Sequence, residues 1–374
     1  MVRRREGLLR LALVAAGACG AVAAALASPG RAEAAASQTW PPFVLVAGLL
    51  VIGVLAAGDG LFEAAGTALA RLPVGGAPLL CSLLVLEAIV TAVLNLDTAV
   101  VFLTPVLLHA ARRRGHGEAP FLYGGVFMAN AASLLLPGSN LTNLIVLARE
   151  HVSGAVFASR TAPAWLVSIA CVLVFLLVVF RHDLREQTEP QEDDDGARLG
   201  AGAAGVVGAA ALVLALRDPA VPVLVLAVAL ALVARLRPAR AAAAANPGLL
   251  VGVFGIAIAL GTLGRALEPL ADLTEQTGRW ASAGLGAGSA LLVNNLPAAA
   301  MLSAHAPAHP RALLVGLDLG PNLAVTGSLS AVLWLQVARA AGAQPSAVRY
   351  SALGVVLVPA SIALAVAALS VTGL

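Results

Sequence analysis

The sequence predicts an all-α polytopic membrane protein built from two inverted-topology repeats, each with a re-entrant hairpin and a broken, unwound transmembrane helix. Composition is the first observation behind this prediction: 60% of the 374 residues are hydrophobic, only 11% are charged, and the mean hydropathy is +0.92. A soluble domain has about 25% charged residues. The composition therefore excludes a soluble enzyme, a nucleic-acid-binding protein and a disordered chain. The other two observations are interrupted apolar segments and the placement of the arginines.

Uncharged stretches as long as a transmembrane helix recur along the chain, because about 20 apolar residues cross the hydrocarbon core of a bilayer. We expect spans at 11–28, 43–58, 121–148, 161–180, 199–216, 219–234, 241–264 and 350–374. Three more stretches, 79–111, 281–310 and 312–338, are apolar but are interrupted by Asn, Pro or Gly. We do not expect straight helices in these three stretches.

The first 36 residues have Arg3–Arg5 ahead of an apolar run and a segment of small residues. This pattern fits a cleaved signal-like segment or a first transmembrane helix that stays attached. We expect the retained helix. Either outcome places residue 40 on the outer face, so residues 1–42 are predicted to be an N-terminal helix with an outer arm.

The rest of the chain contains an internal repeat, which is typical of transporters. Each copy has a plain helix, an amphipathic piece, a pair of apolar arms with a polar interruption, a short hydrophilic link, a long broken segment and a closing helix. We predict a first inverted repeat at 43–181, an acidic cytoplasmic linker at 182–198, connecting transmembrane helices at 199–240 and a second inverted repeat at 241–374. The linker contains Glu192–Asp195 and is expected to be a solvated loop.

Arginines set the orientation, since they collect in the cytoplasmic loops of membrane proteins. With Arg3–Arg5 inside and a hairpin at 79–111 that returns to its starting face, Arg112–Arg114 lie inside. The second repeat begins from the opposite face, so its link at 305–311 lies outside and carries a single arginine, Arg311. The two repeats are therefore predicted to be inverted.

Four breaks in the apolar segments are the candidate binding regions. Non-helical backbone at membrane depth is tolerated only where it is buried in protein or lines a cavity. The breaks lie at 95–98, 137–143, 294–297 and 320–330, and each combines helix breakers with short amide or hydroxyl side chains. Two inverted pairs of such breaks predict a midplane site with alternating access. The candidate substrate- or ion-binding residues are Asn95, Asp97, Thr98, Asn130, Ser139, Asn140, Thr142, Asn143, Asn294, Asn295, Asp318, Asn322, Thr326 and Ser328.

Asp97 and Asp318 are the candidate proton carriers. A lone carboxylate in a span costs about 2.5–3.5 kcal/mol on insertion scales, so it faces the bundle interior or a cavity. Burial favours the protonated form of a carboxyl group, and a group that changes protonation can carry a proton. The alternative for both residues is a structural acceptor that caps a broken helix. Glu87 is expected to extend its carboxylate to the membrane surface, with a second proton site as the alternative.

Other chemistry is not indicated. Ser133 is expected only to hydrogen-bond a neighbouring helix, as hydroxyls in spans often do. Cys19, Cys81 and Cys171 are scattered without metal-ligand spacing, and there is no Walker A loop. We expect no catalytic residue, no metal and no cofactor, so the protein is not expected to be an enzyme.

The breaks resemble the arsenite/antimonite efflux permease (ArsB) family, within the citrate-transporter-like ion transporter superfamily. The resemblance is carried by NLDTAVVFLTP at 95–105, ANAASL at 129–134, SNLTN at 139–143 and NNLP at 294–297. It is strongest in DLGP at 318–321, GSL at 327–329 and LWL at 333–335. It covers roughly residues 43 to 371.

The resemblance implies an inverted-repeat carrier that exports arsenite or antimonite, driven by proton entry or assisted by a soluble ATPase subunit. Three departures bear on the substrate. The family's adjacent Asn-Asp pair is opened here to Asn95-Leu96-Asp97, an acidic position is Asn130, and an expected lysine is Asn322. Losing one acid and one base together keeps the charge balance.

We therefore expect a multi-pass plasma-membrane protein that extrudes arsenite or antimonite by proton antiport and so confers arsenical resistance. Neutral As(OH)₃ suits a midplane that is lined by Asn, Ser and Thr without Arg or Lys. The alternatives are a sodium-coupled dicarboxylate or anion symporter, a sodium/proton antiporter, and a membrane subunit that depends on an ATPase. The expected partners are the inorganic solute, H⁺ or Na⁺, the lipid bilayer and a second copy of the chain in a homodimer, but no nucleic acid.

Overall fold

A computed structural model confirms the all-α architecture. It describes residues 2–148, 150, 152–185, 200–245 and 247–371, and every regular element within these ranges is an α-helix or a short 3-10 turn. The predicted acidic run Glu192–Asp195 lies outside the described residues.

The two repeats present the same order of elements. The first contains α2 (Pro29–Gly58), α3 (Leu61–Ala70), α4 (Gly76–Val93), α5 (Leu96–Arg113), α6 (Glu118–Ala132), the 3-10 turn η1 (Pro137–Ser139), α7 (Leu141–Leu147) and α8 (Gly154–Val179). The second contains α12 (Pro247–Ala266), α13 (Glu268–Gln276), α14 (Arg279–Val293), α15 (Asn295–Leu302), α16 (Pro310–Leu319), the 3-10 turns η2 (Gly320–Leu323) and η3 (Val325–Gly327), α17 (Leu329–Ala340) and α18 (Ala347–Val371). The remaining helices are α1 (Val2–Ala27), α9 (Ala201–Ala215), α10 (Ala220–Val233) and α11 (Pro238–Ala245).

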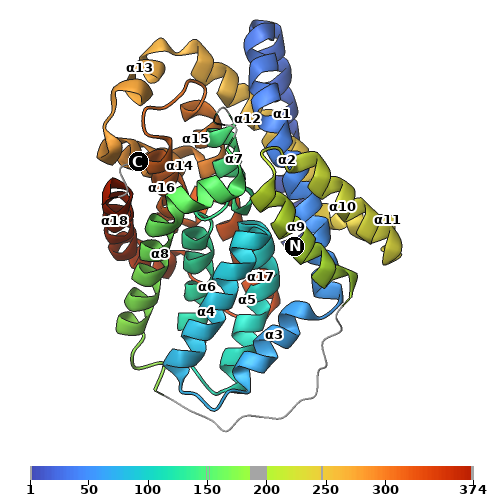
Figure 1. The fold of residues 1–374 in the computed structure, drawn as a ribbon, viewed down its shortest axis with the longest axis vertical. Helices are drawn as coiled ribbons and strands as arrows, with labels where there is room; N and C mark the ends of the chain where they lie inside the picture. Colours follow the sequence, from blue (N-terminus) through green and yellow to red (C-terminus); the bar gives the residue numbers. More distant parts are fainter. Residues whose placement is uncertain (1, 149, 151, 186–199, 246, 372–374) are drawn as a thin grey trace.

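The repeats are inverted with respect to each other. The amphipathic helices α3 and α13 occupy equivalent positions in the two repeats, yet Figure 1 shows α3 at the lower end of the molecule and α13 at the upper end. Packing between the repeats is reciprocal: α17 packs against α5, α7 packs against α15, and the closing helices α8 and α18 pack against each other. Each broken helix therefore ends on the hairpin of the other repeat.

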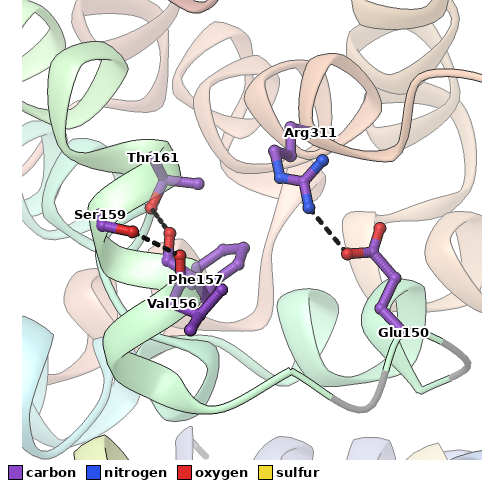
Figure 2. Close-up of polar contacts among 6 residues, drawn as sticks. All are labelled: Glu150, Val156, Phe157, Ser159, Thr161 and Arg311. Carbon is purple, nitrogen blue, oxygen red and sulfur yellow. Dashed lines mark hydrogen bonds and ion pairs between the residues drawn. The ribbon is translucent and has the colours of Figure 1, made fainter. Parts of the chain in front are cut away.

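Contacts at one end of the molecule join segments that the predicted topology places outside. Arg311, at the start of α16, forms an ion pair of 2.8 Å with Glu150, which lies beyond the end of α7 (Figure 2). Gln38 of α2 donates from Nε2 to the carbonyls of Ile145 (3.0 Å) and Ser303 (3.1 Å). These contacts tie the outer link of the second repeat to the broken helix of the first.

Contacts at the other end join segments that are predicted to lie inside. Arg112, at the end of α5, donates from Nη1 to the Ala341 carbonyl at 2.8 Å, just beyond α17. The Asp59 carboxylate, at the end of α2, accepts from the Gly202 backbone N–H of α9 at 2.7 Å. Both sets of contacts therefore join segments that the predicted topology places on the same face.

Four helices are long and apolar enough to cross a membrane in the described part of the chain: α2, α4, α8 and α18. A fifth span arises if Leu250–Ala266 and Glu268–Gln276, which bend by 85° at their junction, are counted together. At 1.5 Å per residue the 18 residues of α4 extend about 27 Å. The chain turns back directly after α4, so the hairpin of α4 and α5 still returns to its starting face.

One boundary differs from prediction, because α2 begins at Pro29 instead of residue 43 and continues through Pro41 and Pro42. Each proline removes its own backbone donor from the helix. Contacts of α2 with other segments hold the helix in place, among them the Gln38 hydrogen bonds described above, although these do not replace the lost backbone bonds.

Small residues bring α1 against α12. A Cβ atom on Gly17 would lie 2.0 Å from the Gly252 carbonyl oxygen, and one on Gly255 would lie 2.3 Å from the Gly17 carbonyl oxygen. Only glycine allows two helix backbones to approach this closely, as in other membrane helix pairs. The N-terminal helix is thereby fixed against the first helix of the second repeat.

Candidate functional site

The first hairpin turns at Leu94 and Asn95, between α4 and α5. Asn95 has extended backbone, and its Oδ1 accepts from the Thr98 backbone N–H at 2.7 Å, which caps α5. Asn95 is 2% exposed, so this tip is enclosed by protein. A polar turn at membrane depth requires such enclosure.

The second hairpin turns at Asn294, between α14 and α15. Asn294 has φ +77°, a conformation that costs a non-glycine residue about 1–3 kcal/mol and that clusters at functional sites. Its Oδ1 accepts from the Leu296 backbone N–H at 3.4 Å, and its Nδ2 donates to the Thr326 carbonyl at 3.1 Å. The tip is therefore held against the unwound part of its own broken helix.

The first broken helix unwinds between α6 and α7, and side chains replace its lost backbone hydrogen bonds. Asn143 donates from Nδ2 to the carbonyls of Ser133 (2.7 Å) and Leu136 (3.1 Å), and the Ser139 hydroxyl donates to the same two carbonyls. Asn140 then caps α7 by accepting from the Thr142 backbone N–H at 3.2 Å. These side-chain hydrogen bonds hold the backbone of the unwound segment in a defined conformation.

The second broken helix unwinds through η2 and η3, and Ser328 caps α17 by accepting from the Ala331 backbone N–H at 3.1 Å. Asn322, in η2, accepts at Oδ1 from Asn130 Nδ2 of α6 (2.8 Å) and from the Tyr350 hydroxyl of α18 (3.3 Å). The residues at which the sequence departs from the arsenite permease pattern, Asn130 and Asn322, are therefore in direct contact.

Both candidate proton carriers accept hydrogen bonds across the boundary between the repeats. Asp97, in the first turn of α5, accepts at Oδ1 from the Ser330 hydroxyl of α17 at 2.5 Å. Asp318, near the end of α16, accepts at Oδ1 from Asn140 Nδ2 at 2.9 Å and is fully buried. Both carboxyl groups are therefore held at the interface between the two repeats.

A cavity of about 580 Å³ brings the two hairpin tips and the two broken helices together. Its polar lining consists of the predicted residues Asp97, Thr98, Asn140, Asn294 and Asn295, together with Ser330. Among the described residues that line it, none is lysine, arginine or histidine, and the others are apolar side chains of α2, α5, α12 and α17 together with residues at the breaks. The cavity therefore offers amide, hydroxyl and carboxyl groups without a basic partner.

The other predicted site residues lie outside the cavity lining. Asn95, Asn130, Ser139, Thr142, Asn143, Asp318, Asn322 and Ser328 are buried in the contacts around the tips and breaks. Several of their polar atoms have no hydrogen-bond partner among the described residues: Asn95 Nδ2, Asn130 Oδ1, Thr142 Oγ1 and Asn143 Oδ1, joined by Thr98 Oγ1 from the lining. Thr326 contributes its carbonyl to Asn294, and its side chain is exposed.

Three polar residues in this region are not among the predicted binding residues. Ser133 lies at the end of α6, where its carbonyl accepts from two side chains of the unwound segment and its hydroxyl accepts from Asn140 at 3.4 Å. Ser330 and Tyr350 are the partners of Asp97 and Asn322. For Ser133 and Ser330 the available signal was their position directly beside a break.

Glu87 differs from expectation as well. Its side chain is 1% exposed, so its carboxylate does not extend to the membrane surface.

In the described part of the chain, no group of three His, Cys, Asp or Glu side chains is placed to hold a metal ion.

Comparison with known proteins identifies a family and several relatives that are similar to this chain in sequence. The sequence profile of a family described as "Citrate transporter" matches residues 2–326. The arsenical pump membrane protein of Escherichia coli strain K12 is 26% identical over 359 residues, which cover 86% of this chain and 84% of that protein. The silicon efflux transporter LSI3 of Oryza sativa is 30% identical over 152 residues, which cover 41% of this chain but only 31% of that protein.

A solved structure supports the fold. The YdaH transporter of Alcanivorax borkumensis superposes with a TM-score of 0.55 and covers 91% of this chain and 86% of its own. Its sequence identity is 16%, so this likeness concerns the fold alone.

Proposed function

The chain belongs to the citrate transporter family, and on that premise we propose that this multi-pass secondary transporter exports arsenite or antimonite in exchange for protons by alternating access. The expected location is the plasma membrane. Two inverted repeats that meet at broken helices support alternating access, because this arrangement lets one part of the protein rock against the other around a midplane site.

The chemistry of the cavity carries the choice of substrate. An anionic substrate at membrane depth needs a positive partner, since an unpaired buried charge is costly. No described lining residue is basic, whereas the lining supplies four amide or hydroxyl side chains from Thr98, Asn140, Asn294 and Asn295 and a fifth from Ser330. A neutral polyhydroxide such as As(OH)₃ can both donate to and accept from such groups.

The names of two relatives are compatible with a neutral hydroxide as the substrate. One is an arsenical pump membrane protein and another a silicon efflux transporter. Trivalent arsenic and silicon both form weakly acidic hydroxides that are largely uncharged at neutral pH. A cavity suited to one such hydroxide is therefore a reasonable site for others of the same class.

Asp97 and Asp318 are the proposed proton carriers. Asp97 lines the cavity, and Asp318 is joined to it through Asn140, which is itself a lining residue. Protonation of either carboxyl group weakens its hydrogen bond to Ser330 or Asn140, because a bond to a charged acceptor is stronger than one to a neutral acceptor. Protonation would thus change the contact between the repeats.

A second candidate is a sodium-coupled carrier of dicarboxylates or another anion, or a sodium/proton antiporter. The description of the family as citrate transporters favours it. The unpartnered oxygens of Thr98, Thr142 and Asn143 could contribute to a sodium site near the tips. The lack of a basic lining residue argues against a dicarboxylate in this cavity.

The test is uptake by proteoliposomes that contain only this protein. Arsenite is offered under an imposed pH gradient, with and without sodium, and Asp97→Asn is compared with Asp272→Asn, a matched change at an exposed position on α13. We expect arsenite movement that depends on the pH gradient, ignores sodium, persists in the Asp272 variant and is lost in the Asp97 variant.

Other outcomes separate the alternatives. Sodium-dependent uptake of a dicarboxylate, or sodium/proton exchange without arsenite movement, would replace the proposal by the second candidate. Arsenite movement only after a soluble ATPase is added would identify the chain as the membrane subunit of a pump. Cross-linking of the purified protein in lipid tests the expected homodimer.

A further inference from the structure

A buried carboxyl group that the proposed mechanism does not use lies in the first hairpin arm. Glu87 belongs to α4 and is 1% exposed, on the face opposite to Val85 and Ile89, which are 44% and 54% exposed. Neither of its carboxyl oxygens has a hydrogen-bond partner among the described residues. An ionised carboxylate in that setting would carry a large desolvation cost without compensation.

Glu87 is part of a line of polar groups that leads to the hairpin tip. Thr91 lies one helical turn further along α4, is fully buried, and has an unpartnered hydroxyl. Asn95 follows after four more residues with an unpartnered Nδ2. Residues four apart share a helix face, so Glu87 and Thr91 are neighbours on the buried side of α4.

No charged group on the described parts of the surrounding helices is bonded to Glu87 to compensate a negative charge there. α4 packs against α3, α5, α6, α8, α9 and η1. The titratable and charged groups on these elements and on α4 itself are Glu63, Cys81, Asp97, His109, Arg112, Arg113, Glu118, Tyr123, Arg160 and Cys171. None of them bonds to Glu87, and Leu84, one turn earlier on the same face, meets apolar neighbours. The state that fits this environment is the neutral, protonated acid.

We propose that Glu87 is a further proton-binding site, which exchanges its proton with the cavity through the Thr91 hydroxyl and the hairpin tip. Glu87, Thr91 and Asn95 make no hydrogen bond with one another in this conformation, so each transfer requires their side chains to rotate within hydrogen-bond distance. The Thr91 oxygen then accepts the proton that leaves Glu87 and releases its own hydrogen towards the tip, where the carboxylate of Asp97 is the acceptor. The carboxylate left at Glu87 is reprotonated by the reverse path. No bond other than O–H is made or broken.

The role of this site in transport rests on the proposed function, but its existence does not. Glu87 and Asp97 belong to the same hairpin, so a charge on either group alters the cost of keeping that hairpin buried. Two protonation events on one moving element would couple more than one proton to each cycle. A proton suits this site better than a metal cation does. A cation such as Ca²⁺ needs about six to eight oxygen ligands, whereas Glu87 and Thr91 together supply three side-chain oxygens.

The experiment measures protonation without any substrate. Purified wild-type protein in lipid nanodiscs is titrated from mildly acidic to alkaline pH, while infrared spectroscopy follows the C=O stretch of protonated carboxyl groups. The isosteric variant Glu87→Gln is compared with Glu63→Gln, the same change at an exposed position on α3. We expect one carboxyl band to be missing from the Glu87 variant only, and one proton fewer to be released per protein over the titration.

A second pair of variants tests the route. Thr91→Val removes the hydroxyl at nearly constant volume and should slow the loss of the Glu87 band after a pH jump, while Thr91→Ser should restore the wild-type rate. An unchanged carboxyl spectrum in Glu87→Gln would overturn the proposal, as would a wild-type protein in which Glu87 stays ionised throughout. If the Gln variant does not fold, the wild-type band and its kinetics in the Thr91 variants decide the question. A Glu87 band that is present in a protein that moves no arsenite would reject the proposed function and leave this site standing.

Discussion

The hydrogen bond between Asn140 and Asp318 provides the sharpest test of how the repeats are coupled. Asn140 has two roles, because its Oδ1 caps α7 while its Nδ2 donates to Asp318 at 2.9 Å. Asn140→Ser keeps a good capping residue but is too short to reach the carboxyl group. The substitution therefore removes the contact between repeats and leaves the helix cap in place.

The expected loss depends on the charge of Asp318. A hydrogen bond to a charged group contributes about 1.5–3 kcal/mol and one between neutral groups about 0.5–1.5 kcal/mol. Asn140→Ser should therefore cost about 1.5–3 kcal/mol in a protein whose Asp318 is ionised, and about half of that in the Asp318→Asn background. The difference between the two costs, obtained as a double-mutant cycle, reports the charge that Asp318 carries in the folded protein.

The assay is denaturant unfolding of the purified protein in detergent, with arsenite flux in proteoliposomes as the functional readout. Ser328→Ala is the control, because Ser328 caps α17 at the equivalent break without contacting a carboxyl group. It should cost about 0.5–2 kcal/mol in both backgrounds. Equal costs of Asn140→Ser in the two backgrounds would show that Asp318 is neutral, and no cost in either would refute the contact itself.

Three further predictions concern packing and the two faces. Gly316→Ala places a Cβ atom 1.9 Å from a backbone oxygen of α14 and should cost about 1–3 kcal/mol or more. Gly288→Ala meets nothing within 4 Å and should be neutral or stabilising. Thermal unfolding compares the two variants, and equal melting temperatures would contradict the α14–α16 packing. Arg311→Gln breaks the ion pair with Glu150, whose two side chains are only 16% and 25% exposed, and should cost about 1–3 kcal/mol by denaturant unfolding because the carboxylate loses its partner in a largely buried position; a cost near zero would contradict this. Trp334→Phe removes the indole N–H that donates to the buried Leu122 carbonyl of α6 at 2.9 Å and should cost about 0.5–1.5 kcal/mol by denaturant unfolding, so an unchanged stability would contradict this contact.

Much of this architecture was predictable because lipid imposes a strict rule on the backbone. A break in an apolar segment must be enclosed by protein, so Asn95, Asn294 and the segments after Ser133 and Gly320 could be placed at the centre from sequence. The arginine pattern then gave the inversion, and the contacts of Arg112 and Arg311 join segments that the prediction had placed on common faces.

The pairing of side chains was not predictable in the same way. Nothing in the local sequence indicates that Ser330 of the second repeat donates to Asp97 of the first, or that Asn130 meets Asn322. These contacts depend on how two repeats far apart in the chain cross each other. The burial of Glu87 was misjudged for the same reason, since a lone carboxylate in an apolar helix can face a neighbouring helix or extend outward.

The contacts between the repeats differ in how they depend on protonation. At the two faces the repeats are joined by Arg311 with Glu150 and by Arg112 with the Ala341 carbonyl. At the centre they are joined through the carboxyl groups of Asp97 and Asp318, where a bond to a charged group contributes about 1.5–3 kcal/mol and one between neutral groups about 0.5–1.5 kcal/mol. Protonation of Asp97 or Asp318, as proposed above, would therefore weaken the contacts at the centre, whereas the Arg112 contact has no titratable acceptor and would stay unchanged.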